Sequence, residues 1–238
     1  MDFSNVKSIT IPEGKVKRIL SGSTVLWQAQ TGRIPSEFQE VDYIKAADNV
    51  GCYINLGFAF DTSARIYLSQ YIETPKSGQY GYVFGAAENS GKLRCMISSP
   101  YLDNGGATGY GSTGTSYIGS AVAVKNNSLN EFELILKKGE LRIKNITTGV
   151  SSPPPTGQAT YTMTSNLYLL AQNYNGSARF GYGRIVKAFS YYDKTDTLIC
   201  DLVPCYRKSD GVIGMYDIVR KIFLTNVGTG SFTKGADV

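Results

Sequence analysis

The strand-like stretch Glu131-Phe132-Glu133-Leu134-Ile135-Leu136 decides the fold class of this chain. Every second residue in it is apolar, and successive side chains of a β-strand point to opposite faces, so the apolar side chains share one face. A turn at Lys137-Lys138-Gly139-Glu140 follows, and the alternation resumes in Leu141-Arg142-Ile143-Lys144. The pattern predicts an antiparallel hairpin with one face in the core and the other in water.

Further strand-like runs, separated by turn residues, lie on both sides of this hairpin. They are Tyr53–Leu56, Ala64–Tyr71, Tyr80–Phe84, Leu93–Ile97, Leu167–Ala171, Ile185–Tyr192, Leu198–Val203 and Lys221–Leu224. No part of the sequence carries a convincing helical stripe of apolar residues. Many short strands without helices predict an all-β fold, which leaves a sandwich, a jelly roll or a barrel open.

The N-terminal residues 1–28 predict a small β-module with strands at Val6–Ile11, Lys15–Leu20 and Thr24–Gln28. A unit of this size is too small to be stable alone, so we expect it to dock on the main domain, on its own copies or on a larger assembly. Its expected docking residues are apolar: Val6, Ile9, Ile11, Val16, Ile19, Leu26 and Trp27. Residues 29–36 follow as a polar linker, and residues 37–238 form the main domain.

Composition indicates a folded chain with no nucleic-acid partner and no membrane span. The hydrophobic fraction of 42% and the charged fraction of 18% are those of a folded domain. The formal net charge of +5 is scattered, without a run of five like charges, so no nucleic-acid arm is indicated. The start, Met1 to Thr10, lacks the apolar core of a signal peptide, and no stretch is apolar enough to span a membrane.

The chain contains no histidine, which excludes Ser-His-Asp and Cys-His nucleophilic sites and histidine metal ligands. Its four cysteines, Cys52, Cys95, Cys200 and Cys205, do not have the spacing of a zinc finger or ribbon. We therefore expect no cofactor and no metal. Calcium held by oxygen ligands remains an alternative, with turn aspartates and asparagines as the ordinary explanation of those residues.

Glu131 and Glu133 are a pair of carboxylates whose spacing suits catalysis, because residues two apart on a strand share a face. Glycoside hydrolysis needs two carboxylates and no histidine. Jelly-roll glycanases of the laminarinase type carry a Glu-x-Asp-x-x-Glu strand, but here Leu136 replaces the third carboxylate and Glu133 the aspartate. We favour the simpler interpretation that both glutamates belong to the solvated face of an outer strand.

Two segments, 100–117 and 172–182, predict binding loops because they combine tyrosine with glycine, serine and asparagine. Tyrosine offers a large contact area at low entropic cost, and the amides supply adaptable hydrogen bonds. The candidate ligand residues are Tyr101, Asp103, Asn104, Tyr110, Tyr117, Asn173, Tyr174, Asn175 and Arg179. The competing explanation is that tyrosine forms strands and glycine forms turns.

Two sets of motifs resemble known families. The stretch from Val6 to Trp27 resembles the N-terminal β-module of structural proteins of phages and prophages of gut Gram-positive bacteria. Other motifs are similar to a laminin-G-like, concanavalin A-like jelly-roll family frequent in the same phages: Val41–Ile44, Tyr53–Gly57, Asp201–Cys205, Gly211–Asp217 and Gly228–Phe232. The resemblance implies a two-sheet antiparallel jelly-roll sandwich, a binding role and a glycan or host-surface partner. We match no laminin-G calcium ligands onto this chain.

These observations lead to one hypothesis and two rivals. We expect a non-enzymatic phage virion surface protein, a tail fibre or capsid decoration protein made in the host cytoplasm. Residues 1–28 would dock on other virion proteins, the jelly-roll loops would bind glycans, and the chain would form a homo-oligomer, a trimer first. The rivals are a glycan-hydrolysing enzyme using Glu131 and Glu133, and a purely structural decoration protein without a ligand.

Overall fold

The regular secondary structure in the described part of the chain consists of β-strands. The computed structural model describes residues 18–21, 24–28, 33–47, 51–73, 81–89, 93–101, 106–112, 117–137, 140–153, 162–180 and 184–238. No α-helix occurs among these residues, so they contain no helix that is long and apolar enough to cross a membrane. The strands are β1 (Arg18–Ser21), β2 (Thr24–Gln28), β3 (Phe38–Glu40), β4 (Ile44–Ala46), β5 (Ile54–Asp61), β6 (Ala64–Ile72), β7 (Gly81–Glu88), β8 (Leu93–Tyr101), β9 (Gly106–Ser112), β10 (Tyr117–Ala123), β11 (Ser128–Lys137), β12 (Glu140–Asn145), β13 (Val150–Ser151), β14 (Thr162–Leu169), β15 (Gln172–Tyr174), β16 (Ser177–Arg179), β17 (Arg184–Tyr192), β18 (Leu198–Arg207), β19 (Ile213–Asp217), β20 (Ile222–Thr225) and β21 (Phe232–Lys234).

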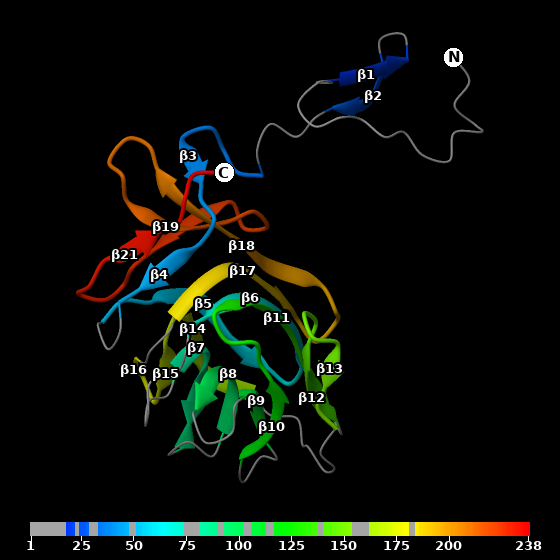
Figure 1. Cartoon of the computed structure of the whole chain (residues 1–238), viewed down its shortest axis with the longest axis vertical. Helices are drawn as coiled ribbons and strands as arrows, with labels where there is room; N and C mark the ends of the chain where they lie inside the picture. The colour runs from blue at the N-terminus through cyan, green and yellow to red at the C-terminus, as the bar shows by residue number, and fades with distance from the viewer. Residues whose placement is uncertain are drawn as a thin grey trace.

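The strands form two large sheets that face each other, which confirms the two-sheet jelly-roll sandwich (Figure 1). The eight-stranded sheet has the order β10-β9-β8-β7-β14-β5, with β15 beside β7 and β16 beside β15. The eleven-stranded sheet has the order β13-β12-β11-β6-β17-β18-β19-β20, and β3, β4 and β21 extend it. Pairing is antiparallel except between β15 and β7. The β1–β2 hairpin forms a separate sheet, and the division into residues 1–28, 29–36 and 37–238 stays a prediction.

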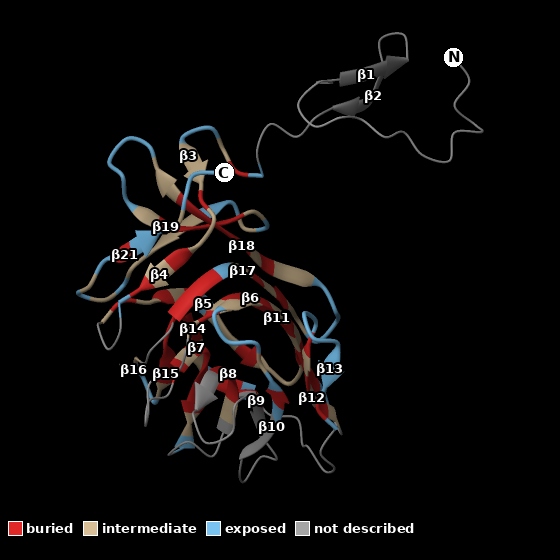
Figure 2. Cartoon of the chain, viewed as in Figure 1, coloured by how far each residue is buried: buried red, intermediate tan, exposed pale blue. Residues whose placement is uncertain are grey.

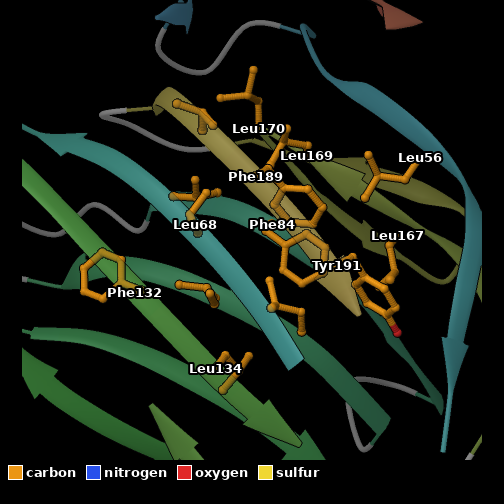
Figure 3. Packing of buried hydrophobic residues seen from close by; sticks show 14 of the residues in the cluster. Leu56, Leu68, Phe84, Phe132, Leu134, Leu167, Leu169, Leu170, Phe189 and Tyr191 are labelled. Carbon is orange, nitrogen blue, oxygen red and sulfur yellow. The ribbon is translucent and has the colours of Figure 1, made fainter. Parts of the chain in front are cut away.

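The core lies between the two sheets, where apolar side chains of both inner faces meet (Figures 2 and 3). Phe84 of β7 and Phe189 of β17 come from opposite sheets, and their ring centroids are 5.0 Å apart. Leu68 of β6 and Phe132 of β11 are completely buried beside them. Each fully buried aromatic or leucine side chain contributes about 2 kcal/mol through the apolar area it removes from water.

The 131–144 hairpin is confirmed as predicted. In β11 and β12, Leu136 pairs with Leu141 and Lys137 pairs with Glu140. Phe132, Leu134 and Leu136 are buried, as expected for one face of an alternating strand.

The expectation of a loop over residues 100–117 is wrong for the residues of this segment that the structure describes. Strand β8 continues to Tyr101, β9 covers residues 106–112, and β10 begins at Tyr117. Gly109 of β9 explains why the segment is rich in small residues: a Cβ atom there would lie 2.5 Å from Leu134 Cδ1 of the opposite sheet. Small residues in this segment therefore make room for the core.

Segment 33–41 and the C-terminus lie side by side at one end of the sandwich (Figure 1). The Val238 N–H donates to Glu40 O at 3.1 Å, and Gln39 Nε2 donates to Val238 O at 3.0 Å. Phe38 packs between the rings of Tyr216 and Phe223, with centroid distances of 5.1 and 4.7 Å. Segment 33–41 is thus held by the C-terminus and, through Phe38, by β19 and β20.

Arg184 at the start of β17 is a charged side chain with no solvent exposure. Its guanidinium donates to Cys52 O at 2.9 Å, to Leu170 O at 2.7 Å, and to Ala47 O. Cys52 precedes β5 and Leu170 follows β14, both in the eight-stranded sheet, while Ala47 follows β4 of the eleven-stranded sheet. Arg184 therefore joins both sheets at one end of the sandwich and satisfies backbone acceptors that strand pairing leaves over.

We expect Arg184→Met to lower the free energy of unfolding by about 3 kcal/mol, because it leaves buried carbonyl oxygens without donors. Urea denaturation at neutral pH measures the change. Arg142→Met is the matched control, since Arg142 lies on an exposed face, and it should shift the value by no more than about 0.5 kcal/mol. Equal effects of the two substitutions would contradict the role assigned to Arg184.

Asp217 at the end of β19 organises the turn into β20. Its Oδ1 accepts the backbone N–H groups of Val219 and Arg220 at 2.9 and 3.1 Å, and Arg220 Nε donates to Oδ2 at 2.5 Å. Arg220 also donates to Leu56 O of β5 at 2.6 Å, which links the edges of the two sheets. Burial works to raise the pKa of Asp217, but the hydrogen bonds from Arg220 and its backbone outweigh it and lower that pKa.

The lowered pKa of Asp217 predicts an acid-sensitive contribution to stability. A carboxyl whose folded-state pKa is depressed stabilises the fold above its unfolded pKa of about 3.9 and loses this contribution as pH falls through the folded pKa. We expect Asp217→Asn to cost about 2 kcal/mol at pH 7, and the difference from wild type to shrink below about pH 4. Urea denaturation across this range measures it. A difference that is constant with pH would refute the assignment.

Candidate functional site

The structure places six of the nine predicted binding residues on strands. Tyr101, Tyr110 and Tyr117 lie in β8, β9 and β10, while Asp103 and Asn104 fall outside the described residues. The backbone of Tyr110 pairs with that of Met96.

The second predicted loop, 172–182, is largely the β15–β16 hairpin, so the expectation of an irregular loop there is wrong. Asn175 and Gly176 form its two-residue turn with φ values of 49° and 86°, the left-handed conformation that Asn-Gly favours in hairpins. Asn173 is buried and uses its amide internally: Oδ1 accepts the Gly176 N–H at 2.9 Å, and Nδ2 donates to Asn166 O at 2.8 Å. Asn173 thus fixes the hairpin.

Tyr174 and Arg179 are the predicted residues that the hairpin brings together. The Arg179 guanidinium carbon lies 3.3 Å from the centroid of the Tyr174 ring, a cation–π stack. Arg179 is exposed and Tyr174 is half-buried. No carboxylate in the described part of the chain forms an ion pair with Arg179.

Residues of β5 and β14 extend this surface across the outer face of the eight-stranded sheet. Tyr168 lies between the core residues Leu167 and Leu169, so it points away from the core. Its ring stacks on that of Tyr53 at 4.5 Å and 28°, and its backbone pairs with Asn55. Burial raises the pKa of Tyr168. The charge of Tyr53 and its hydrogen bond with Tyr168 raise that pKa further.

Gln172 connects the two parts of this surface. Its amide nitrogen lies 2.9 Å from the sulfur of Met96 on β8, and Gln172 shares a strand face with Tyr174 two residues later. We call the resulting surface the tyrosine face; it consists of Tyr53, Asn55, Tyr168, Gln172, Tyr174 and Arg179. Tyr168 and Gln172 are buried, so the accessible residues of this face are Tyr53, Asn55, Tyr174 and Arg179. Four of the six residues, Tyr53, Asn55, Tyr168 and Gln172, are not among the ligand residues predicted from the sequence. Strand alternation around Tyr168 was the available signal for one of them.

The carboxylates Glu131 and Glu133 lie on the outer face of the opposite, eleven-stranded sheet. Tyr67 Oη donates to Glu131 Oε1 at 2.6 Å, and Arg65 Nη1 lies 3.8 Å from Glu133 Oε1. Burial and this contact with Glu131 raise the pKa of Tyr67. Both carboxylates are therefore engaged by side chains of β6, consistent with a solvated, charge-paired strand face.

All four cysteines are buried and unpaired. Burial raises the pKa of the Cys52 thiol to about 11 and that of Cys205 to about 12, which keeps both protonated. No group of three or more cysteine, aspartate or glutamate side chains in the described part of the chain could hold a metal ion.

The docking residues expected in the N-terminal module are described only in part. Ile19 lies in β1, Leu26 and Trp27 lie in β2, and the backbones of Ile19 and Trp27 pair. Val6, Ile9, Ile11 and Val16 fall outside the described residues. Their docking role stays a prediction.

A pocket of about 360 Å³ lies between β19, β20 and β21. Its lining residues are Asp210, Gly211, Val212, Ile213, Thr225, Asn226, Gly230, Ser231 and Phe232. Asn226 uses its amide to hold the backbone: Oδ1 accepts the N–H groups of Tyr53 and Gly228, and Nδ2 donates to the carbonyls of Gly228 and Gly230. The Asn226 side chain of the pocket is thus committed to the fold.

No protein-family model matches the sequence, and no curated protein sequence is similar to it. Solved structures with a partly similar fold include the CBM40 domain of a Ruminococcus gnavus IT-sialidase bound to α2,3 sialyllactose, with 13% identity, a TM-score of 0.46, and coverage of 64% of this chain and 91% of that one. Domains LG4-5 of the mouse laminin α1 chain have 11% identity, a TM-score of 0.46, and coverage of 84% and 45%. A tailspike protein of bacteriophage CBA120 has 12% identity, a TM-score of 0.41, and coverage of 59% and 23%. The fold assignment rests on the strand pairing described above.

The two hydrogen bonds of Asn173 predict that this residue sets the rigidity of the β15–β16 hairpin. We expect Asn173→Ala to speed hydrogen exchange of the Gly176 amide and its neighbours, by a factor of about five to ten for the loss of about 1 kcal/mol. Hydrogen–deuterium exchange measures the change. Ser177→Ala, on the exposed side of the same hairpin, is the control and should leave the rates as they are. Unchanged exchange in Asn173→Ala would contradict the prediction.

Proposed function

We propose that this chain is a non-enzymatic, glycan-binding protein of a phage virion surface, and that the tyrosine face holds the glycan. The observation that carries the proposal is the combination, on one sheet face, of the Tyr53–Tyr168 stack with the Tyr174–Arg179 stack. Aromatic rings beside amide and guanidinium groups suit sugars, because the C–H face of a sugar packs on a ring while its hydroxyl groups need donors and acceptors.

The polar groups of the tyrosine face complement hydroxyl groups. Asn55 Oδ1 accepts the Gly57 N–H at 2.9 Å, and its amide nitrogen has no acceptor among the described residues. Arg179 adds several N–H donors beside the Tyr174 ring. The face belongs to strands and a pinned hairpin, so little conformational entropy is lost when a ligand binds.

The position of the face supports its display on a particle. Segment 33–41 enters the sandwich beside the C-terminus at the upper end of Figure 1, while the β15–β16 hairpin lies in the lower half (Figure 1). Attachment through residues 1–28 and the linker 29–36 would leave the hairpin accessible. A homo-oligomer, a trimer first, would present several copies and raise a weak affinity by avidity.

The engaged state of Glu131 and Glu133 supports a binding role over hydrolysis. A retaining or inverting glycosidase needs one carboxyl to donate a proton and the other to act as nucleophile or base. Here Tyr67 donates to Glu131, and Arg65 lies beside Glu133. Catalysis would have to break both contacts.

A glycan array followed by calorimetry with the full chain tests the proposal. We expect Tyr174→Ala to weaken binding of the best glycan about tenfold, the loss of one stacking surface and of the support for Arg179. Tyr192→Ala is the matched control, because Arg65 lies 3.7 Å over its ring on the opposite sheet, and it should bind like wild type.

Two results would overturn this proposal. Turnover of β-glucans or host cell-wall polysaccharides that is lost in Glu133→Gln would establish the enzyme. An array without a bound glycan, together with particles weakened by deletion of the protein, would establish a purely structural decoration protein.

A further inference from the structure

Arg179 gives the tyrosine face a positive charge. Its side chain is exposed on this face, and no carboxylate in the described part of the chain forms an ion pair with it. None of the six residues that define the tyrosine face is an aspartate or a glutamate.

The nearest carboxylate along β7 is committed elsewhere. Glu88 follows Ala87, which pairs with Tyr174 of β15, and so points to the other side of the strand. Its Oε1 accepts the N–H and hydroxyl groups of Thr164 at 2.9 and 3.0 Å, and the N–H of Ser165. Burial works to raise the pKa of Glu88, but these hydrogen bonds outweigh it and lower that pKa. Glu88 serves β14 and does not neutralise Arg179.

The opposite sheet contains the same arginine–tyrosine stack in a neutralised form. Arg65 lies 3.7 Å over the ring of Tyr192, but its Nε donates to Asp196 at 2.9 Å, and Glu133 lies 3.8 Å away. Arg179 has the same stacking and no carboxylate partner in the described part of the chain. Arg65 thus has carboxylate partners within the fold, whereas the exposed guanidinium of Arg179 faces solvent.

We infer that Arg179 is a specificity-determining residue that selects glycans bearing a carboxylate, such as sialic or uronic acids. The inference rests on the proposed function of the tyrosine face. A carboxylate accepts two parallel N–H bonds from the planar guanidinium, and the stack on Tyr174 holds that plane in place. The sugar ring then packs on the aromatic surface beside it. A neutral sugar gains the packing without the paired charge-assisted bonds.

Calorimetry of the full chain with matched probes tests this inference. The probes are sialyllactose against its methyl ester, and trigalacturonate against its trimethyl ester; the members of each pair differ only in whether their carboxyl groups are free or esterified. We expect wild type to bind at least one acidic probe about tenfold more tightly than its neutral partner, with the preference weakening at high salt. Arg179→Gln should reduce this ratio to about one, because it weakens binding of the acidic probe far more than that of the neutral probe, and Arg179→Lys should give an intermediate ratio.

Arg142→Gln on the opposite sheet is the matched control and should keep the wild-type ratio. Wild type that binds acidic and neutral partners equally, or Arg179→Gln that keeps the preference, would refute the inference and leave glycan binding intact. Failure of every probe and of every arrayed glycan to bind would instead refute the proposed function. Loss of binding to both members of a pair in Arg179→Gln would make Arg179 a general contact and also refute the selectivity.

Discussion

The structure depends on the burial of two alternating sheet faces against each other. Phe84 and Phe189 meet at its centre, 5.0 Å apart, from strands of different sheets. Because side chains alternate along a strand, each strand that supplies the core also supplies residues to an outer face. Leu167 and Leu169 enter the core and so direct Tyr168 outward. The positions of the outer-face residues are therefore set by the same pattern that drives folding.

The sequence predicts the fold where alternation is strong and fails where the core needs small residues. The 131–144 hairpin could be predicted with its register because charged and apolar residues alternate on both sides of its turn. Strand β9 could not, since glycine, serine and threonine make up most of it and are typical of a loop. Gly109 faces Leu134 and Ile143 of the opposite sheet at distances that exclude a larger side chain. Only the opposing sheet, which the local sequence does not reveal, explains that composition.

The candidate site was predictable in the same partial way. Composition pointed to Tyr174 and Arg179, and the hairpin joins them because an Asn-Gly turn places their strands side by side. The same composition also pointed to Asn173, whose amide is consumed by the hairpin. The stack of Tyr53 on Tyr168 joins positions far apart in the sequence. Such contacts follow from sheet order, which local patterns do not determine.

The tyrosine face has few polar groups, and this limits how tightly one copy of the protein could bind a ligand. Gln172 and Asn173 are buried and point their amides at the fold, which leaves Asn55 and Arg179 as the main donors beside the rings. A site with few polar contacts on an open sheet buries little of a sugar, so its affinity for one ligand is modest. Residues 1–28, which we expect to be too small a unit to be stable alone, would need a docking surface on the main domain, on their own copies or on a larger assembly. Assembly into several copies would therefore answer both needs at once: it would stabilise the module and convert weak single contacts into firm attachment.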